Sequence, residues 1–166
     1  MPEDLSIHAG SKEEQYKSLI PQIRGLLTGE SDLIANLANI AAALKEQFGW
    51  LWVGFYLVKN DANNVEEELV LAPFQGPVAC TRIKKGRGVC GVAWQNAKTL
   101  IIPDVEKFPG HIACSSFSKS EIVIPLLKDG KVAGVLDVDS QYLHFFDETD
   151  QKYLEEIAEL VDLEII

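Results

Sequence analysis

Apolar and polar positions in the first fifty residues recur with the spacing of an α-helix. Ser11, followed three residues later by Glu14, has the form of a capping box, and it predicts a helix that runs to about Leu27. Ser31 stands where it can cap a second helix. The apolar positions of that second helix are Leu33, Ile34, Leu37, Ile40, Ala41, Leu44 and Phe48.

From residue 50 onward the pattern changes to short aromatic and β-branched runs, which are typical of strands. The predicted strands cover residues 50–59, 68–74, 80–83, 99–102, 121–127 and 131–140. Asp129 and Gly130 join the last two strands. Because Asp-Gly between apolar runs is a strong signal for a tight turn, these strands are expected to form a β-hairpin.

Three segments complete the chain. Residues 89–96 favour a short helix, and Asp147, with Asp150 three residues later, favours the start of a last helix. The apolar positions of that last helix are Leu154, Ile157, Ala158 and Val161. Residues 103–120 show neither period, and an irregular stretch of this length inside a compact domain is usually a functional loop.

The order of these elements predicts an α+β fold in a single domain that spans residues 1–166. We expect a central antiparallel sheet of about six strands, with the N- and C-terminal helices on one face. The loops between residues 60 and 120 would cover the other face. A ligand pocket is then expected between the sheet and these loops.

Composition and charge narrow the possible partners. Of the 166 residues, 47% are hydrophobic and 24% charged, which is typical of a globular protein, and the net charge is −10. An acidic chain without a basic run gives little electrostatic support for binding nucleic acid or an anionic membrane. The longest apolar run, residues 50–58, is too short to span a bilayer, and the first residues lack the pattern of a signal peptide. We therefore expect a cytoplasmic protein.

Two aspartates lie unusually within the predicted hairpin. Asp137 and Asp139 alternate with apolar residues, so both side chains point to the same face of the sheet. Glu121 opens the neighbouring strand and is placed to join them. Three carboxyl groups in one concavity cannot all ionise cheaply, so at least one would hold a proton near neutral pH. The alternative is that this face is solvated and the aspartates are surface residues.

The three cysteines offer a second kind of chemistry. Cys114 lies in the long loop among Ser, Gly and His, where exposure favours the reactive thiolate. Cys80 and Cys90 flank a basic turn, and Cys90 fits a small buried hydrophobic residue best. Zinc binding by the three thiols and His111 remains open, although no Cys-x-x-Cys pair is present. A Cys-His dyad of His111 and Cys114 is also open.

Aromatic residues are concentrated in the first predicted strand. By strict alternation Trp50, Trp52 and Tyr56 share one face of that strand. Most of this aromatic surface is expected to be core, and part of it is placed to line the pocket.

Taken together, several short motifs resemble the free methionine-(R)-sulfoxide reductases, which are single-domain proteins with a GAF fold. The motifs are WVGFY at 52–56, GPVAC at 76–80, GRGVCG at 86–91, PGHIAC at 109–114, EIVIP at 121–125 and GVLDVDS at 134–140. The resemblance covers nearly the whole chain, from about Ser11 to the final helix. Three cysteines together with three carboxylates make it specific.

The resemblance implies that the protein reduces free L-methionine (R)-S-oxide to methionine without a cofactor. Cys114 would attack the sulfoxide sulfur and become a sulfenic acid. Cys80 would then form a disulfide with it, Cys90 would be a second or alternative recycling thiol, and thioredoxin would restore the thiols.

The resemblance also implies a substrate pocket without a metal ion. Glu121, Asp137 and Asp139 would bind the substrate ammonium and hold or protonate the sulfoxide oxygen. Trp52 and Tyr56 would pack on the methylthio end.

Two other functions compete with this one. A non-catalytic GAF module would bind a small ligand and tolerate loss of the cysteines, although such modules are usually fused to an output domain. A redox sensor would form its disulfide with peroxide and show no preference for methionine sulfoxide. A homodimer is plausible for any of the three, because the first and last helices carry apolar positions on more than one side.

Overall fold

The computed structural model describes residues 4–111 and 114–163. Its elements, in chain order, are α1 (Lys12–Leu27), α2 (Leu33–Phe48), β1 (Trp52–Asn60), β2 (Glu67–Gln75), β3 (Arg82–Lys84), α3 (Gly88–Asn96), β4 (Leu100–Ile102), the 3-10 turn η1 (Val105–Lys107), β5 (Ser120–Lys128), β6 (Lys131–Ser140) and α4 (Glu148–Glu159).

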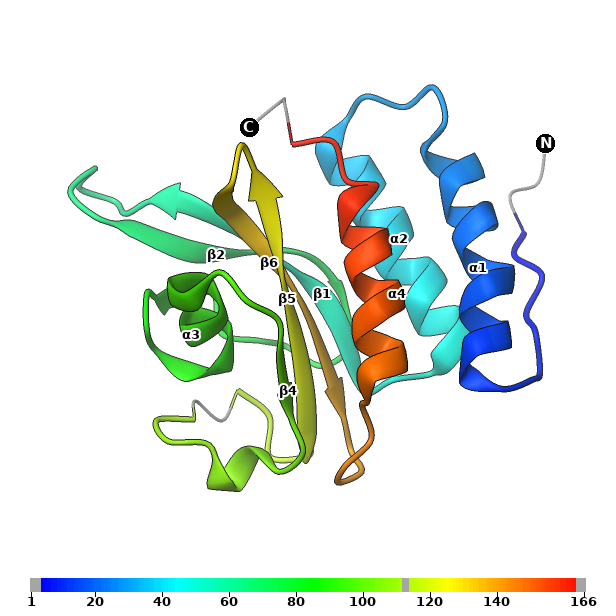
Figure 1. Ribbon diagram of the computed structural model, residues 1–166. Helices are drawn as coiled ribbons and strands as arrows, with labels where there is room; N and C mark the ends of the chain where they lie inside the picture. The colour runs from blue at the N-terminus through cyan, green and yellow to red at the C-terminus, as the bar shows by residue number, and fades with distance from the viewer. Residues whose placement is uncertain (1–3, 112–113, 164–166) are drawn as a thin grey trace.

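The strands form one antiparallel sheet in the order β3-β2-β1-β6-β5-β4. Figure 1 shows α1, α2 and α4 on one face of this sheet, and α3 with the loop between β4 and β5 on the other. The predicted α+β architecture is confirmed, including the two-sided arrangement of helices and loops. The strands at the centre of the sheet, β1 and β6, are therefore covered on both faces.

Alternation along β1 divides the core into two clusters. Val53, Phe55 and Leu57 point toward the helices, whereas Trp52 and Tyr56 point toward α3 and the loops. The helix-side cluster is the larger of the two, and it contains fully buried residues from all three covering helices. The second cluster is smaller and surrounds the candidate functional residues described below.

The predicted common face of the three aromatic residues is wrong for Trp50. β1 begins at Trp52, and Gly49 ends α2 in the left-handed conformation, so residue 50 precedes the strand and does not follow its alternation. The Trp50 side chain stacks on Phe48, with ring centroids 4.4 Å apart, and it belongs to the helix-side cluster.

Two predicted element boundaries also change. Asp32, not Ser31, caps α2, and its Oδ1 accepts a hydrogen bond of 2.8 Å from the backbone N–H of Ala35. Both residue types are good helix caps, so the sequence alone does not separate neighbours of this kind. Cys80 lies outside β3, which begins two residues later at Arg82.

A buried carboxylate attaches α1 to α4. Asp150 is fully buried and accepts hydrogen bonds from the Tyr16 hydroxyl at 2.6 Å and the Lys12 ammonium at 2.6 Å. It also accepts one from the backbone N–H of Asp147, which completes the predicted capping box of α4. One side chain therefore caps its own helix and holds the first helix against the last.

Among the residues that the structure describes, no helix is both long and apolar enough to cross a membrane.

We expect the substitution Asp150→Ala to lower the free energy of unfolding by about 2–4 kcal/mol, because it leaves the buried Tyr16 hydroxyl without its acceptor and removes the buried partner of the Lys12 ammonium. Urea unfolding followed by circular dichroism measures this change. Glu148→Ala, at an exposed acidic residue in the same helical turn, is the control and should cost less than about 1 kcal/mol. Equal losses in the two variants would contradict the role given to Asp150.

Candidate active site

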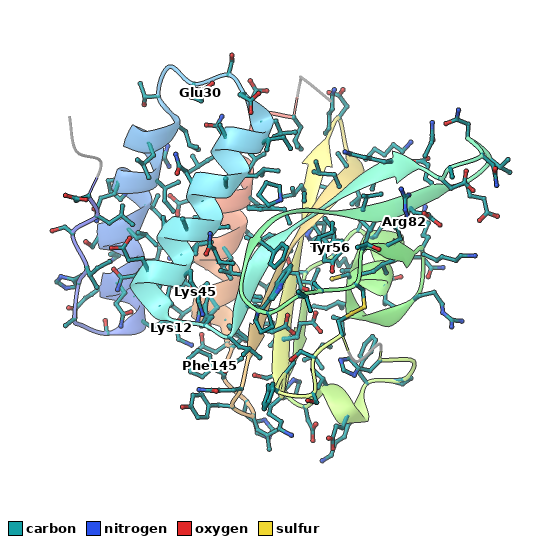
Figure 2. The ribbon with its side chains drawn as sticks, turned by 180° about the vertical axis from the view of Figure 1, so that it is seen from behind. Lys12, Glu30, Lys45, Tyr56, Arg82 and Phe145 are labelled. Atoms are coloured by element: carbon teal, nitrogen blue, oxygen red, sulfur yellow. A yellow bond between two sulfur atoms is a disulfide. The ribbon has the colours of Figure 1, made fainter. Side chains whose placement is uncertain are left out.

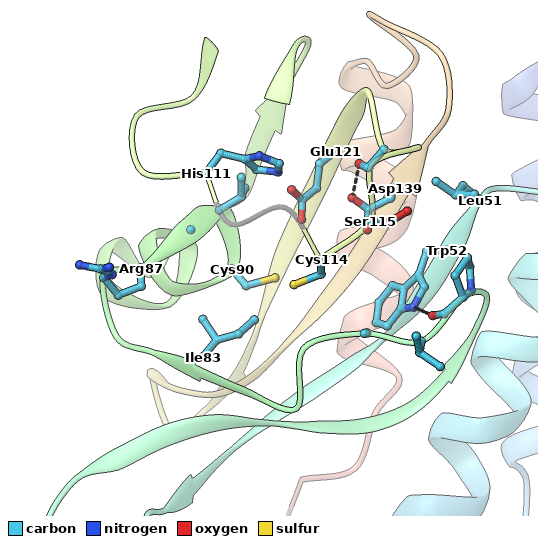
Figure 3. Close-up of a pocket in the computed structure, with 16 residues that line it drawn as sticks. Leu51, Trp52, Ile83, Arg87, Cys90, His111, Cys114, Ser115, Glu121 and Asp139 are labelled. Carbon is cyan, nitrogen blue, oxygen red and sulfur yellow. Dashed lines mark hydrogen bonds between the residues drawn. The ribbon is translucent and has the colours of Figure 1, made fainter. Parts of the chain in front are cut away.

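A small cavity lies between the sheet and the loops on the face opposite α1, α2 and α4. Its volume is about 60 Å3, and five of the predicted site residues line it, as Figure 3 shows for each of them: Trp52, Cys90, Cys114, Glu121 and Asp139. These residues come from β1, α3, the long loop, β5 and β6. The fold thus brings together residues that are up to 87 positions apart in the sequence.

The remaining predicted residues lie next to this cavity. Asp137 and Tyr56 are buried behind its wall, and Cys80 is joined to a lining residue by a disulfide bond. The structure therefore collects all eight predicted side chains in one region, but only five of them reach the cavity surface.

Cys80 and Cys114 form a disulfide across 34 residues of sequence, with their Cα atoms 5.6 Å apart. Cys114 is exposed and Cys80 half-buried. The Tyr56 hydroxyl donates a hydrogen bond of 2.8 Å to the backbone carbonyl of Cys80, which fixes the position of that residue against β1. Figure 2 shows Tyr56 in the middle of this face, between the sheet and the loops.

In this state the disulfide leaves two alternatives from the sequence without the free thiols that they require. Zinc binding by three thiols and His111 is wrong for this state, because the sulfurs of Cys80 and Cys114 are bonded to each other. A dyad in which His111 activates Cys114 has no free thiol here for the same reason. His111 lines the cavity, and its partial burial lowers the pKa of its imidazole, while the nearby Glu106 charge opposes this change.

The three carboxyl groups lie together because of strand register. Glu121 on β5 pairs with Asp139 on β6, and Asp137 lies two residues away on the same face of β6. Glu121 and Asp137 are each only 6% exposed. The alternative that this face is solvated is therefore wrong. Glu121 and Asp137 are interior groups, and Asp139 is half-buried on the face that alternation predicted it to share with Asp137.

Burial controls the protonation of these groups. Loss of solvation, followed by the repulsion of neighbouring carboxylates, raises the pKa of Glu121 and of Asp139 well above the ordinary value. Burial also raises the pKa of Asp137, against hydrogen bonds with Glu121 and Cys90 that lower it. Protons are therefore retained in the cluster near neutral pH.

Two further features determine which hydrogen-bond donors and acceptors the cluster presents to a ligand. The Ser118 hydroxyl donates a hydrogen bond of 2.8 Å to Oδ1 of Asp139. The Oδ1 atom of Asp137 is buried, and it has no hydrogen-bond partner among the described residues. The site thus combines proton donors with an unused acceptor.

Cys90 is buried at the start of α3, as predicted. Burial, followed by repulsion from Asp137 and Glu121, raises the pKa of its thiol well above the ordinary value. Since the thiolate is the nucleophilic form of cysteine, Cys90 is unreactive in this state.

Cys90, Glu121 and Asp137 are also the group of possible metal ligands found among the described residues, with donor atoms within 4.8 Å of one another. A single thiol with two carboxyl groups that hold protons is a poor match to a structural zinc site, which usually has paired thiols or imidazoles. The donor set therefore favours proton chemistry over metal binding.

The aromatic wall is held by close packing. The Trp52 indole N–H donates a hydrogen bond of 3.1 Å to the Pro77 carbonyl, and its ring stacks on Phe74 with centroids 5.2 Å apart. A Cβ atom at Gly54 would lie 2.3 Å from the Cβ of Phe74, so only glycine allows these strands to approach. Tyr56 lies beside Trp52, and burial together with the nearby carboxylates raises the pKa of its hydroxyl.

Sequence reasoning missed Ser118 and Arg87 as lining residues. Ser118 lies at the end of the irregular loop, and no pattern in the sequence distinguishes it from its serine neighbours. Arg87 was noted only as part of a basic turn. The structure places it at the N-cap of α3, with its exposed side chain at the cavity.

Comparison with known proteins gives consistent matches. The GAF domain family model matches residues 32–165. GAF domain-containing protein A of Dictyostelium discoideum is 70% identical to the chain, over 98% of this chain and 99% of its own length. The free methionine-R-sulfoxide reductase of Escherichia coli is 43% identical, over 89% of this chain and 87% of its own length.

A solved structure is also closely similar. The X-ray structure of free methionine-R-sulfoxide reductase from Neisseria meningitidis in complex with its substrate is 55% identical to the chain. It superposes with a TM-score of 0.90, and the match covers 96% of this chain and 93% of the other.

The raised pKa values predict how stability depends on pH. A carboxyl group whose pKa is raised by folding stabilises the folded state fully below its unfolded pKa of about 4.3. This contribution is lost as the pH rises through the raised folded pKa. Between about pH 5 and about pH 8 we therefore expect the free energy of unfolding to fall less steeply in Glu121→Gln than in the unsubstituted chain, by up to about 1.4 kcal/mol per pH unit.

Urea unfolding of the disulfide form at several pH values measures these slopes. Glu46→Gln, at an exposed glutamate on α2, is the control and should reproduce the slope of the unsubstituted chain. If Glu121→Gln also reproduces that slope, Glu121 does not keep its proton in the folded protein.

Proposed function

The chain belongs to the GAF-domain family of free methionine-(R)-sulfoxide reductases, and we propose that it reduces free L-methionine (R)-S-oxide to L-methionine with the thiol of Cys114. The observation that carries this proposal is the disulfide of Cys80 and Cys114 at a cavity that Glu121 and Asp139 also line. A thiol pair and a proton donor beside one cavity are the two requirements for removing oxygen from a sulfoxide.

In the reduced protein, the Cys114 thiolate attacks the sulfur of the bound sulfoxide. The oxygen needs a proton as this bond forms, and a carboxyl group with a raised pKa supplies it. The oxygen then passes from the substrate sulfur to Sγ of Cys114 as the new bond between the two sulfurs breaks, so methionine leaves and Cys114 becomes a sulfenic acid. The substrate sulfur has then gained two electrons and Cys114 has lost them.

In the second step the Cys80 thiol attacks the sulfur of the sulfenic acid. The S–O bond breaks, water leaves and the disulfide forms. The distance of 5.6 Å between the two Cα atoms in the disulfide is within the ordinary range for such bonds. The present structure corresponds to the product of this step.

The carboxyl groups have two tasks in this scheme. Glu121 and Asp139 line the cavity, so one of them protonates or holds the sulfoxide oxygen and an ionised member of the cluster attracts the substrate ammonium. Asp137 lies behind them and, through its hydrogen bonds with Glu121 and Cys90, takes part in sharing the protons. Trp52 borders the space for the methylthio group, and Tyr56 supports it from behind.

Several finer features complete the proposal. A thioredoxin reduces the exposed disulfide, and the buried Cys90 thiol is a reserve that exchanges with it. Reduced thiols of this kind fit a cytoplasmic location. Residues 1–166 act as one GAF domain, and the half-exposed side chains of Ile7 and Ile34 on the helical side are consistent with a homodimer.

The reaction is tested with dithiothreitol and each resolved epimer of free methionine sulfoxide, with methionine quantified by chromatography. We expect methionine from the free R epimer alone. Cys114→Ser should lose at least about 1,000-fold in rate, because the hydroxyl that replaces the thiol is a far weaker nucleophile near neutral pH.

Two controls make the result decisive. A peptide-bound sulfoxide tests whether the free amino acid is required, and circular dichroism confirms that Cys114→Ser is folded. If the folded, reduced protein yields no methionine from either epimer, the reductase is ruled out. Oxidation by peroxide without turnover of methionine sulfoxide would point to a redox sensor.

A further inference from the structure

The two halves of the disulfide are not equally accessible. Cys114 is exposed, whereas Cys80 is half-buried and its carbonyl accepts the hydrogen bond from the Tyr56 hydroxyl. In thiol–disulfide exchange, access decides in part which of two sulfurs is attacked. A large attacking molecule therefore meets Cys114 first.

Exposed apolar side chains flank this disulfide on both sides. Val78, two residues before Cys80, is 87% exposed, and Phe117, three residues after Cys114, is 68% exposed. Their position beside the disulfide follows from chain connectivity, since the two cysteine Cα atoms are 5.6 Å apart. Large apolar groups held in water next to a reducible bond mark a surface that another molecule covers.

We propose that a protein dithiol of the thioredoxin type docks over Phe117 and Val78 and attacks Sγ of Cys114. This inference rests on the proposed function for the origin of the disulfide, and it adds the docking surface and the direction of attack. The occupant is a protein dithiol because the disulfide at the centre of the surface needs two electrons and two protons, which a dithiol supplies.

The exchange is balanced in two steps. A thiolate of the dithiol protein attacks Sγ of Cys114, the bond to Cys80 breaks, and Cys80 leaves as a thiolate that takes up a proton. The second thiol of the partner then attacks the sulfur of the partner's first cysteine, which is bonded to Cys114 in the mixed disulfide. Cys114 leaves as a thiolate, and the partner keeps the disulfide.

The direction of attack is tested by trapping the mixed disulfide. A thioredoxin whose second active-site cysteine is replaced by serine cannot complete the exchange. It is mixed with the disulfide form of the Cys90→Ser chain, in which no third thiol can rearrange the product. Trypsin places the two remaining cysteines in separate peptides, residues 60–82 for Cys80 and 108–119 for Cys114.

Mass spectrometry then identifies the attached peptide. We expect thioredoxin on residues 108–119. Attachment to residues 60–82, or failure to form a mixed disulfide, would overturn the proposal. The experiment contains no methionine sulfoxide, so its outcome does not depend on whether the protein is a reductase.

The docking surface is tested with Phe117→Ser, because Phe117 does not line the cavity and its backbone N–H bond to Ser115 is unaffected by the change. The preformed disulfide is reduced either by intact thioredoxin or by dithiothreitol, and the free thiols are alkylated and counted over time. Val65→Ser is the matched control, since Val65 is 78% exposed in the distant turn between β1 and β2.

We expect Phe117→Ser to slow reduction by thioredoxin about tenfold, the usual effect of truncating an aromatic residue in an interface, and to leave reduction by dithiothreitol unchanged. Val65→Ser should match the unsubstituted chain with both reductants. Equal thioredoxin rates in the three chains would show that Phe117 is not part of a docking surface. A loss with both reductants would show that its role is local structure.

Discussion

The burial of three carboxyl groups on adjacent strands is the constraint on which the rest of this structure depends. Glu121, Asp137 and Asp139 lose most of their contact with water, and three charges so close together would repel one another strongly. The cluster is stable because it keeps protons. That protonation in turn gives the cavity an acid at neutral pH, which a reaction at a sulfoxide oxygen requires. The helices on the far face supply the large core that stabilises the sheet against this local cost.

The disulfide connects this acid cluster to the surface. Cys114 lines the cavity and is also exposed, so the same sulfur can meet a small substrate from one side and a protein reductant from the other. Cys80 is held in place through the Tyr56 hydroxyl, and Tyr56 itself lies on β1 beside Trp52. The strand that carries the aromatic wall thus also positions the second thiol.

Much of this arrangement could be predicted from local chemistry. The turn at Asp129 and Gly130 has positive φ at both residues, as an Asp-Gly hairpin requires, and it pairs Lys128 with Lys131. A register shift between Leu126 and Leu127, which the sequence did not predict, then brings Glu121 opposite Asp139. Alternation placed Asp137 and Asp139 on one face of their strand, but it left open whether that face is interior or solvated. The pairing of Cys80 with Cys114 could not be predicted from local chemistry, because residues so far apart in the sequence are brought together only by the complete fold. The expectation that they pair came from the family resemblance. Trp50 was misplaced because alternation applies only within a strand, and Ser118 was missed because its contact with Asp139 is made across the fold.

The most direct test of the central claim is a single turnover without added reductant. The fully reduced chain is mixed with free L-methionine (R)-S-oxide, methionine is quantified, and each cysteine is located by alkylation and peptide mapping. The account predicts about one methionine per chain, with a Cys80–Cys114 disulfide and a free Cys90 thiol. Methionine formed while Cys114 stays alkylatable, or no methionine at all, would contradict it.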